Sequence, residues 1–138
     1  GNIVCTGAKT ELQSRLASRQ CTRLLQKAGL NIMFKDFRIQ NIVASASVGY
    51  PIKLRALLQK YSACASYEPE LFPGLIYRES VPKIVFLVFR SGKIVITGAK
   101  TKEKLLNGFQ SFYTRVLLHF QDRDDLTTSS SLYRIKHR

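Results

Sequence analysis

The sequence is poor in acidic residues, in cysteine and in long apolar runs, and each shortage excludes a class of protein. Only 9 of its 138 residues are Asp or Glu, against 22 Lys and Arg, which leaves a formal net charge of +13. Such an excess indicates a polyanionic partner, with nucleic acid first and an anionic membrane second. Three cysteines, far apart and without metal-type spacing, favour a reduced intracellular compartment over a disulfide framework. No apolar run approaches the length that spans a membrane.

Groups suited to catalysis or metal binding are equally scarce. The two histidines, His119 and His137, do not pair with a cysteine or carboxylate at the spacing of a metal site or an activated nucleophile. Asp122, Asp124 and Asp125 stand too close together in a polar stretch to form an acid/base pair. We therefore expect no catalytic residue, no metal and no cofactor, and the sequence favours a binding protein over an enzyme.

A ten-residue segment occurs twice in the chain. Residues 1–10, GNIVCTGAKT, recur as residues 92–101, GKIVITGAKT, with eight identical positions at an offset of 91. Identity at that level predicts an internal duplication. The second copy contains a strand–helix–strand section before Gly92 that has no counterpart before Gly1, so we expect the front half of the first repeat to be missing. The expected organisation is the second half of a first repeat (1–33), a complete second repeat (34–120) and a polar, flexible tail (121–138).

Hydrophobic periodicity predicts the elements within both repeats. In the first, a strand over 3–5 precedes a helix that begins with a capping box of Thr10 and Gln13 and ends at Gly29. In the second, the expected elements are strands over 34–45, 75–79, 83–89 and 93–98, a short helix over 51–60 and a long amphipathic helix through Phe120. Tight turns between the last strands imply an antiparallel sheet with helices on one face, an α+β fold.

The strands expected over 83–89 and 93–98 are apolar on both faces. Along the first of them, Ile84, Phe86 and Val88 alternate with Val85, Leu87 and Phe89. An antiparallel sheet that meets water on one side normally alternates apolar with polar residues. The few expected helices cover one side only, so the other apolar face has to meet a ligand, a partner domain or a second copy.

Four motifs resemble the TATA-box-binding protein family. They are residues 40–43, residues 66–78, residues 89–93 and the duplicated Val-x-Thr-Gly-Ala-Lys, and the most specific stretch is Tyr-Glu-Pro-Glu-Leu-Phe-Pro-Gly at 67–74. The resemblance runs over roughly residues 1–120. It implies a saddle-like curved antiparallel sheet with helices on the convex face. It also supplies an occupant for the uncovered apolar face, a widened and bent DNA minor groove.

The resemblance implies roles for individual residues. The implied DNA contacts are Val4, Thr6, Asn41, Val43, Phe72, Pro73, Val85, Leu87, Phe89, Val95 and Thr97. Asn41, Thr97 and Thr6 would donate to adenine N3 or thymine O2, and Phe72 and Phe89 would insert between base pairs. The implied phosphate contacts are Arg78, Lys83, Arg90 and Lys93, of which Arg90 departs from the small or apolar residue usual in the family. The segment of Glu68, Glu70 and Leu71 matches the stirrup that family members present to general initiation factor B.

The expected function is that of a general transcription initiation factor in the nucleus. It would bind and bend A/T-rich, TATA-type promoter DNA and nucleate the pre-initiation complex. One alternative is a diverged paralogue that mainly docks proteins and binds TATA elements weakly. Another is an enzyme domain that shares the saddle fold, as in some DNA-repair enzymes. With strands of the first repeat missing, we also expect an unpaired sheet edge and self-association.

Overall fold

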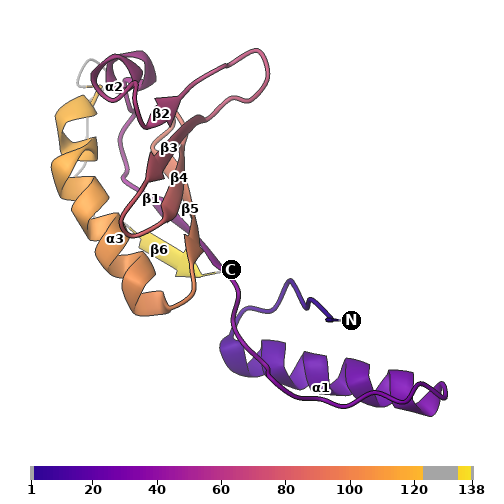
Figure 1. Ribbon diagram of the computed structural model, residues 1–138. Helices are drawn as coiled ribbons and strands as arrows, with labels where there is room; N and C mark the ends of the chain where they lie inside the picture. Colours follow the sequence, from indigo (N-terminus) through magenta and orange to yellow (C-terminus); the bar gives the residue numbers. More distant parts are fainter. Residues whose placement is uncertain (1, 123–133, 138) are drawn as a thin grey trace. The chain divides into compact units, whose positions relative to one another are not determined.

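The chain divides into two units, with the boundary after Gln40. The computed structural model describes residues 2–122 and 134–137. The first unit ends at Gln40 and the second runs from Asn41 to His137. Figure 1 shows the first unit in indigo and purple, with its single helix, and the second unit with its sheet. The sequence repeat predicted this boundary after residue 33, seven residues earlier than it is found.

The first unit contains helix α1 (Glu11–Lys27), with segments before and after it that form no helix or strand. The helix begins at Thr10, whose side chain accepts the N–H of Gln13 at 3.1 Å. It ends in a Schellman motif, in which Gly29 has a φ of +90° and the amides of Gly29 and Leu30 donate to carbonyls of the last turn. Both ends of the predicted helix are therefore confirmed.

The strand expected over residues 3–5 is wrong. Residues 2–10 contain no helix or strand, and Val4 is 77% exposed. Strand backbone groups need a ladder partner, and no strand in the described residues pairs with this segment. Leu24 of α1 is exposed as well, while Thr22 is the buried residue of the helix.

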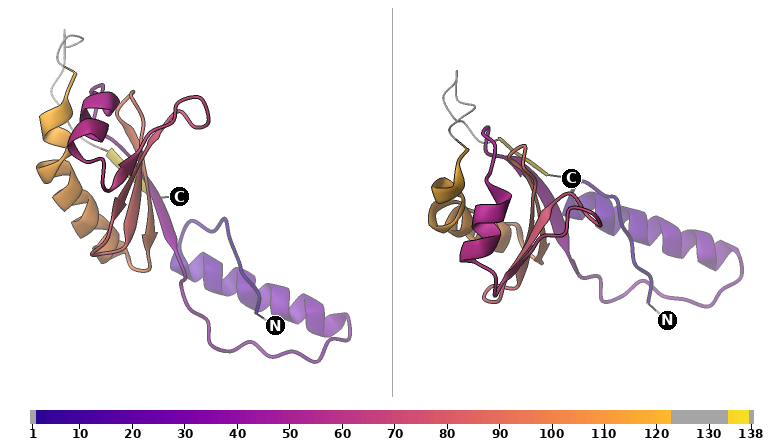
Figure 2. Two further views of the ribbon diagram at one scale, coloured as in Figure 1. Left: turned by 45° about the horizontal axis from the view of Figure 1, so that its top comes forward. Right: turned by 90° about the horizontal axis from the view of Figure 1, so that it is seen from above.

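The second unit is an antiparallel sheet covered by helices on one face (Figures 1 and 2). Its strands are β1 (Ile42–Ser47), β2 (Ala65–Ser66), β3 (Leu75–Glu79), β4 (Ile84–Val88), β5 (Lys93–Ala99) and β6 (Arg134–His137). Its helices are α2 (Leu54–Lys60), α3 (Lys102–Arg115) and the 3-10 helix η1 (Leu117–Phe120). Across the sheet the order is β2-β3-β4-β5-β1-β6. None of the helices in the described ranges is long and apolar enough to cross a membrane.

The expected elements of this unit are present with shifted ends. Strand β3 has the expected bounds, β4 is one residue shorter at each end, and β5 is one residue longer at its end. The strand expected over 34–45 starts only at Ile42, because its ladder partner β5 ends at Ala99, directly opposite. The short helix begins three residues later than expected, and the long helix divides into α3 and η1. The two-residue strand β2 was not predicted.

Strand β6 lies in the segment expected to be a flexible tail. Its four residues pair antiparallel with β1, from His137 opposite Ala44 to Arg134 opposite Ser47. The tail expectation is therefore wrong for residues 134–137, and residues 123–133 lie outside the described part of the chain. The edge of β1, expected to be free, carries β6 instead.

The core of the second unit fills the space between the sheet and the helices. Phe86 of β4 and Phe112 of α3 are fully buried, and their rings stack with centroids 4.1 Å apart. Close approach of α3 depends on Gly108, since a Cβ there would lie 2.3 Å from Cδ1 of Ile84. In the second unit, α2 and α3 cover this one face of the sheet, and no other described helix of that unit covers the opposite face.

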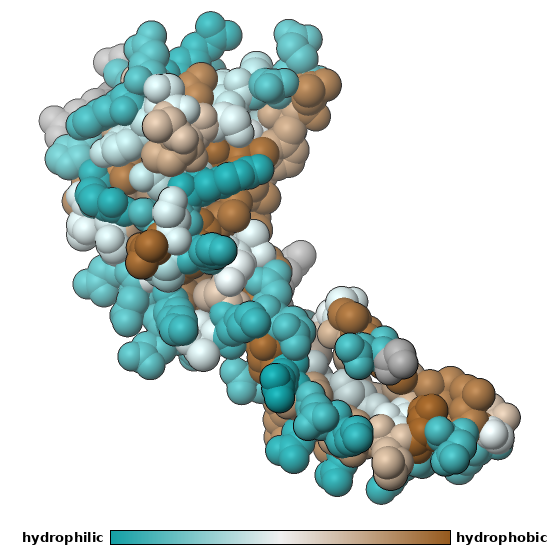
Figure 3. All heavy atoms as spheres, viewed as in Figure 1, coloured by the Kyte–Doolittle hydropathy of each residue, from teal (hydrophilic) through white to brown (hydrophobic). Residues whose placement is uncertain are grey.

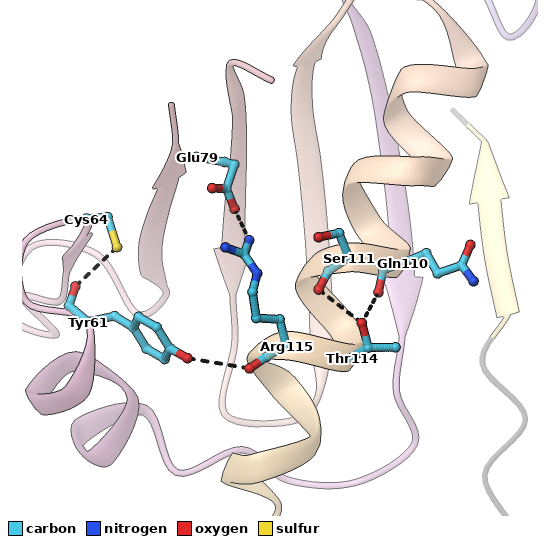
Figure 4. A network of polar contacts seen from close by, with 7 residues as sticks. All are labelled: Tyr61, Cys64, Glu79, Gln110, Ser111, Thr114 and Arg115. Carbon is cyan, nitrogen blue, oxygen red and sulfur yellow. Dashed lines mark hydrogen bonds and ion pairs between the residues drawn. The ribbon is translucent and has the colours of Figure 1, made fainter. Parts of the chain in front are cut away.

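A polar network fixes the β2–β3 side of the sheet to the helices (Figure 4). Arg115, at the end of α3, forms an ion pair with Glu79, at the end of β3. This bond raises the pKa of the Arg115 guanidinium above its ordinary value. The hydroxyl of Tyr61 donates to the carbonyl of Arg115 at 3.4 Å, and the thiol of Cys64 donates to the carbonyl of Tyr61 at 3.5 Å. These contacts join the end of β3 and the segment before β2 to the end of α3.

Candidate nucleic-acid interface

The face of the sheet that α2 and α3 leave uncovered is here called the open face. Its members alternate along the strands with buried core residues. They are Val43, Ser45 and Ser47 of β1, Ile76 and Arg78 of β3, Val85 and Leu87 of β4, and Lys93, Val95 and Thr97 of β5. All of them are half-buried or exposed, and Figure 3 shows apolar surface between polar side chains on this unit.

Strand register arranges the open face in rows. The central row joins Ile76, Leu87, Val95 and Ser45, each opposite its neighbour. Three of its four members are aliphatic, so the middle of the face is apolar, as the two-sided pattern of the strands predicts. Ile76, Ser45 and Ser47 were not among the predicted contacts. The period-two alternation from Arg78 and from Val43 was the signal that could have found them.

Hydrogen-bonding groups gather at one end of the open face, around Asn41. The Asn41 Oδ1 accepts the N–H of Gly98 at 2.8 Å, and the Nδ2 donates to Thr97 Oγ1 at 2.9 Å. These contacts depend on an irregularity in the ladder, where the register between β1 and β5 shifts and Gly98 takes a φ of +104°. They hold the Asn41 amide in place and leave its second hydrogen without an acceptor in the described residues.

Two phenylalanines meet at the opposite end of the open face. The rings of Phe72 and Phe89 pack edge to face, with centroids 5.8 Å apart and planes at 64°. Both are half-buried and lie outside the core cluster. Large aromatic rings that are neither buried in the core nor fully solvated are available to a ligand.

Backbone geometry brings these two rings together. Phe89 continues the open-face alternation of β4, whereas Phe72 comes from the β2–β3 loop. In that loop the amide of Phe72 donates to the carbonyl of Glu68 at 2.9 Å, which closes a turn. Gly74 lies buried beneath the pair, and a Cβ there would come within 2.7 Å of the Phe72 ring and 3.1 Å of the Phe89 ring. The absence of a side chain at this position therefore permits the ring contact.

Cationic side chains stand around the open face. Arg78 lies opposite Val85 in the ladder, and Lys93 lies opposite Ser47. Lys83 precedes β4 and Arg90 belongs to the turn between β4 and β5; all four are exposed. Among the residues that the structure describes, none of the four forms an ion pair with a carboxylate. An apolar surface with cations at its margin suits a ligand with an apolar middle and anionic edges.

The other predicted contacts fall into two groups. Glu68, Glu70, Leu71 and Pro73 are exposed in the β2–β3 loop, and Leu71 reaches 81% exposure. Val4 and Thr6 are exposed in the irregular segment of the first unit. Their predicted position on a strand is corrected by this finding, and their contact with DNA stays a prediction.

Comparison with known proteins decides the family. The family model described as "Transcription factor TFIID (or TATA-binding protein, TBP)" matches residues 36–118, which hold most of the open face. The chain belongs to the TATA-binding protein family. Its match covers the motifs at 40–43, 66–78 and 89–93 that carry the resemblance in the sequence.

Relatives of this TATA-binding protein family member bear out both the family and the fold. TATA-box-binding protein 2 of Arabidopsis thaliana is 58% identical over 113 residues, which cover 82% of this chain and 56% of that protein. The Tetrahymena thermophila TATA-box-binding protein is 52% identical over 124 residues, 90% of this chain and 50% of that protein. The chain thus spans about half the length of the curated relatives it matches. The solved structure of Methanococcus jannaschii TBP matches with a TM-score of 0.72 at 36% identity, over 85% of this chain and 69% of that one. The predicted α+β fold of the saddle type is confirmed.

Proposed function

We propose that this TATA-binding protein family member binds A/T-rich promoter DNA through its open face and bends the duplex. The proposal makes the chain a transcription initiation factor that acts in the nucleus. It is supported by the family, by relatives named TATA-box-binding proteins at 52–58% identity, and by the chemistry of the open face. Identities at this level do not favour the alternative of a diverged paralogue with weak TATA binding.

The open face suits the floor of the minor groove. Both orientations of an A·T pair present only acceptors there, whereas a G·C pair adds the guanine amino group. A row of Ile76, Leu87 and Val95 packs against a floor without donors and excludes an amino group that it cannot hydrogen-bond. Asn41, with its second amide hydrogen, supplies a donor for adenine N3 or thymine O2 at one end. Selectivity for A/T-rich sequence follows from this combination of apolar contact and few donors.

The Phe72–Phe89 pair carries the proposal that the duplex bends. An edge-to-face pair at the end of an apolar face, outside the core, is placed to enter a base step from the minor groove. Unstacking a step costs a few kcal/mol, which the additional contact with bent DNA offsets. Without such insertion, a narrow minor groove would not accept a sheet several strands wide.

The charge of the chain supports binding to DNA phosphates, and the exposure of the β2–β3 loop supports binding to a protein partner. A net charge of +13 favours association with a polyanion, and Arg78, Lys83, Arg90 and Lys93 supply phosphate contacts around the open face. The exposed Glu68, Glu70 and Leu71 offer an acidic and apolar tip to a protein partner, for which we propose general initiation factor B. The tip leaves the sheet beside Phe72, so the same loop serves both partners.

The test is the bending of a TATA-type duplex by the 138-residue chain and its variants. Energy transfer between dyes at the duplex ends measures bending, and fluorescence anisotropy measures affinity. Phe72→Ala and Phe89→Ala are expected to reduce bending by more than they reduce thermal stability, because neither ring belongs to the core. If the two phenylalanines were core residues, each change to alanine would instead lower the unfolding free energy by about 3–5 kcal/mol.

The matched control removes an exposed apolar side chain from the helix-bearing side. Leu118, in η1, is 40% exposed, and Leu118→Ala is expected to leave bending and affinity unchanged. Strong thermal destabilisation by both phenylalanine changes, together with unchanged bending by the remaining folded protein, would refute insertion. Failure of the unaltered chain to prefer A/T-rich over G/C-rich duplexes would refute the proposed function itself.

A further inference from the structure

The hairpin turn between β4 and β5 begins at Phe89, one of the two phenylalanines proposed to enter a base step. The amide of Gly92 donates to the carbonyl of Phe89 at 3.0 Å, which closes the turn. Gly92 has a φ of +83°, as is usual for the last residue of a three-residue hairpin loop. Arg90 and Ser91 therefore lie at the tip of the turn, beyond the paired part of both strands.

Two backbone hydrogen bonds fix this turn to the segment between β1 and α2. The amide of Ile52 donates to the carbonyl of Arg90 at 2.9 Å, and the amide of Val48 donates to the carbonyl of Gly92 at 3.0 Å. A Cβ on Gly92 would overlap the carbonyl oxygen of Tyr50, so the close approach requires glycine. The backbone of Arg90 is thus held in place, while its side chain is exposed.

Arg90 and Lys93 are both cations of this turn region, but they differ in position. Lys93 is the first residue of β5 and lies opposite Ser47 in the ladder, at the margin of the open face itself. Arg90 lies past the end of the ladder, directly after Phe89. No carboxylate among the described residues pairs with Arg90. A guanidinium on a fixed and exposed backbone position suits a phosphate, whose binding needs charge and reach but no base identity.

The contacts proposed on the open face set the direction of a bound duplex. Asn41, bonded to β5, offers its donor at one end of the strands, and the Phe72–Phe89 pair enters a base step at the other. A minor groove that meets both runs along the strands. The duplex beyond the inserted step then continues past the tip of the turn, and its first phosphates come within reach of Arg90.

We propose that Arg90 extends the DNA interface beyond the inserted step and binds a backbone phosphate of the flanking duplex. The inference rests on the proposed function, because it requires a duplex on the open face with a step entered by the phenylalanine pair. It adds a second DNA segment to that function, one outside the A/T-rich box and held by charge without sequence choice. The added contact offsets part of the cost of unstacking the step.

Anisotropy titrations of the 138-residue chain over a range of salt concentrations test this contact. Two duplexes of identical sequence are compared, and in one of them uncharged methylphosphonates replace all phosphates outside the A/T-rich box. Arg90→Ala is expected to lower the salt slope of affinity by about 1 on the fully charged duplex and to leave it unchanged on the duplex with neutral flanks. Arg90→Lys keeps a cation at the position and is expected to restore the slope.

Two further variants serve as matched comparisons. Lys93→Ala is expected to lower the slope by a similar amount on both duplexes, because its phosphate belongs to the box. Lys104→Ala removes a charge from an exposed position of α3 and is expected to leave the slope unchanged on both. The melting temperatures of all these variants are expected to match that of the unaltered chain, since the three side chains are exposed.

An equal loss of slope on both duplexes would overturn the proposal, because Arg90 would then contact a phosphate of the box, as Lys93 does. An unchanged slope on the fully charged duplex would overturn it as well, since Arg90 would contact no phosphate. The proposed function is decided by a separate comparison, with A/T-rich and G/C-rich boxes between neutral flanks. If the unaltered chain shows no preference between these boxes, the proposed function fails and the inference fails with it.

Discussion

The side-chain amide of Asn41 is held by the backbone N–H of Gly98, which donates to Asn41 Oδ1 at 2.8 Å. The two residues are 57 positions apart and meet because the β1–β5 ladder shifts its register there. The Oδ1 atom of the amide thus bonds the backbone where the β1–β5 ladder is irregular. The other side faces Thr97, 2.9 Å away, and retains one further hydrogen. The structural contact with Gly98 therefore uses the oxygen of the Asn41 amide, and the DNA contact that we propose uses a hydrogen on its nitrogen.

That separation gives the first prediction. Asn41→Asp keeps an acceptor for the Gly98 N–H but loses the donor and adds a negative charge, so DNA affinity should fall steeply while stability changes little. Asn41→Ala loses both roles and should weaken DNA binding while also costing about 0.5–1.5 kcal/mol of unfolding free energy. Urea unfolding and anisotropy titration with an A/T-rich duplex measure the two quantities. Equal losses of affinity and stability in the aspartate variant would contradict the division of roles.

The second prediction concerns Gly74, beneath the phenylalanine pair. A Cβ at this position would lie 2.7 Å from Cε1 of Phe72 and 3.1 Å from Cε1 of Phe89, so Gly74→Ala should drive the rings apart. The rings lie outside the core and can move, and the cost in stability should stay below about 1 kcal/mol. Bending of DNA, measured by energy transfer, should fall while the melting temperature is nearly kept. An alanine variant that bends DNA like the unaltered chain would show that the ring contact is not required.

Local patterns in the sequence were sufficient for much of the fold. The caps at Thr10 and Gly29 were predicted because capping chemistry is set by residues within a few positions of each other. Strands β3, β4 and β5 were predicted because their side chains alternate and the turns between them are short. The open face followed from the same alternation. The motif at 67–74, which contains Phe72, indicated the family.

Features that depend on distant partners could not be predicted from local patterns. Residues 3–5 have strand-like composition but find no ladder partner in the described structure, whereas the polar segment 134–137 does find one in β1. Four residues are too few to show a periodicity. The bond between Asn41 and Gly98 likewise depends on a register shift that neither strand reveals alone.

The third prediction concerns packing between α3 and β4. An added Cβ at Gly108 would lie 2.3 Å from Cδ1 of Ile84, which is fully buried. Gly108→Ala improves helix propensity by about 1 kcal/mol, yet overpacking of about 1–3 kcal/mol should make it destabilising. Ile84→Val removes the clashing methyl group, so the double variant should be more stable than the sum of the single changes predicts, by about 1 kcal/mol or more. Thermal and urea unfolding of the four proteins measure this coupling, and simple additivity would contradict the contact.

The fourth prediction concerns alkaline pH. Tyr50 is only 4% exposed, and burial raises its pKa to about 12. In the unfolded chain the same phenol titrates near its ordinary pKa of about 10. Between these values the native state holds a proton that the unfolded state has lost, so stability is complete below pH 10 and falls as the pH rises toward 12.

Replacement of the Tyr50 hydroxyl isolates this contribution. We compare the unfolding free energy of Tyr50→Phe with that of the unaltered chain at pH 8 and at pH 11. Between these two pH values, the difference should change by about 1–1.5 kcal/mol in favour of the variant. Burial raises the pKa of Tyr77 in the same direction, so part of the alkaline loss should persist in the variant. Urea unfolding at the two pH values provides the measurement. Parallel pH dependence of the two proteins would show that Tyr50 ionises alike in the folded and unfolded states.

The last prediction separates affinity from sequence choice at the open face. A phosphate contact releases counterions on binding, so Arg78→Ala and Lys93→Ala should each lower the salt slope of DNA affinity by about 1. Both changes should weaken binding to A/T-rich and G/C-rich duplexes alike, because phosphates carry no base identity. Thr97→Val should have the opposite signature, an altered preference between the duplexes at an unchanged slope. Lys104→Ala removes the same charge from an exposed position of α3, on the helix-bearing side, and serves as the control. An equal loss of slope in this control would mean that the whole basic surface, and not the margin of the open face, attracts the DNA.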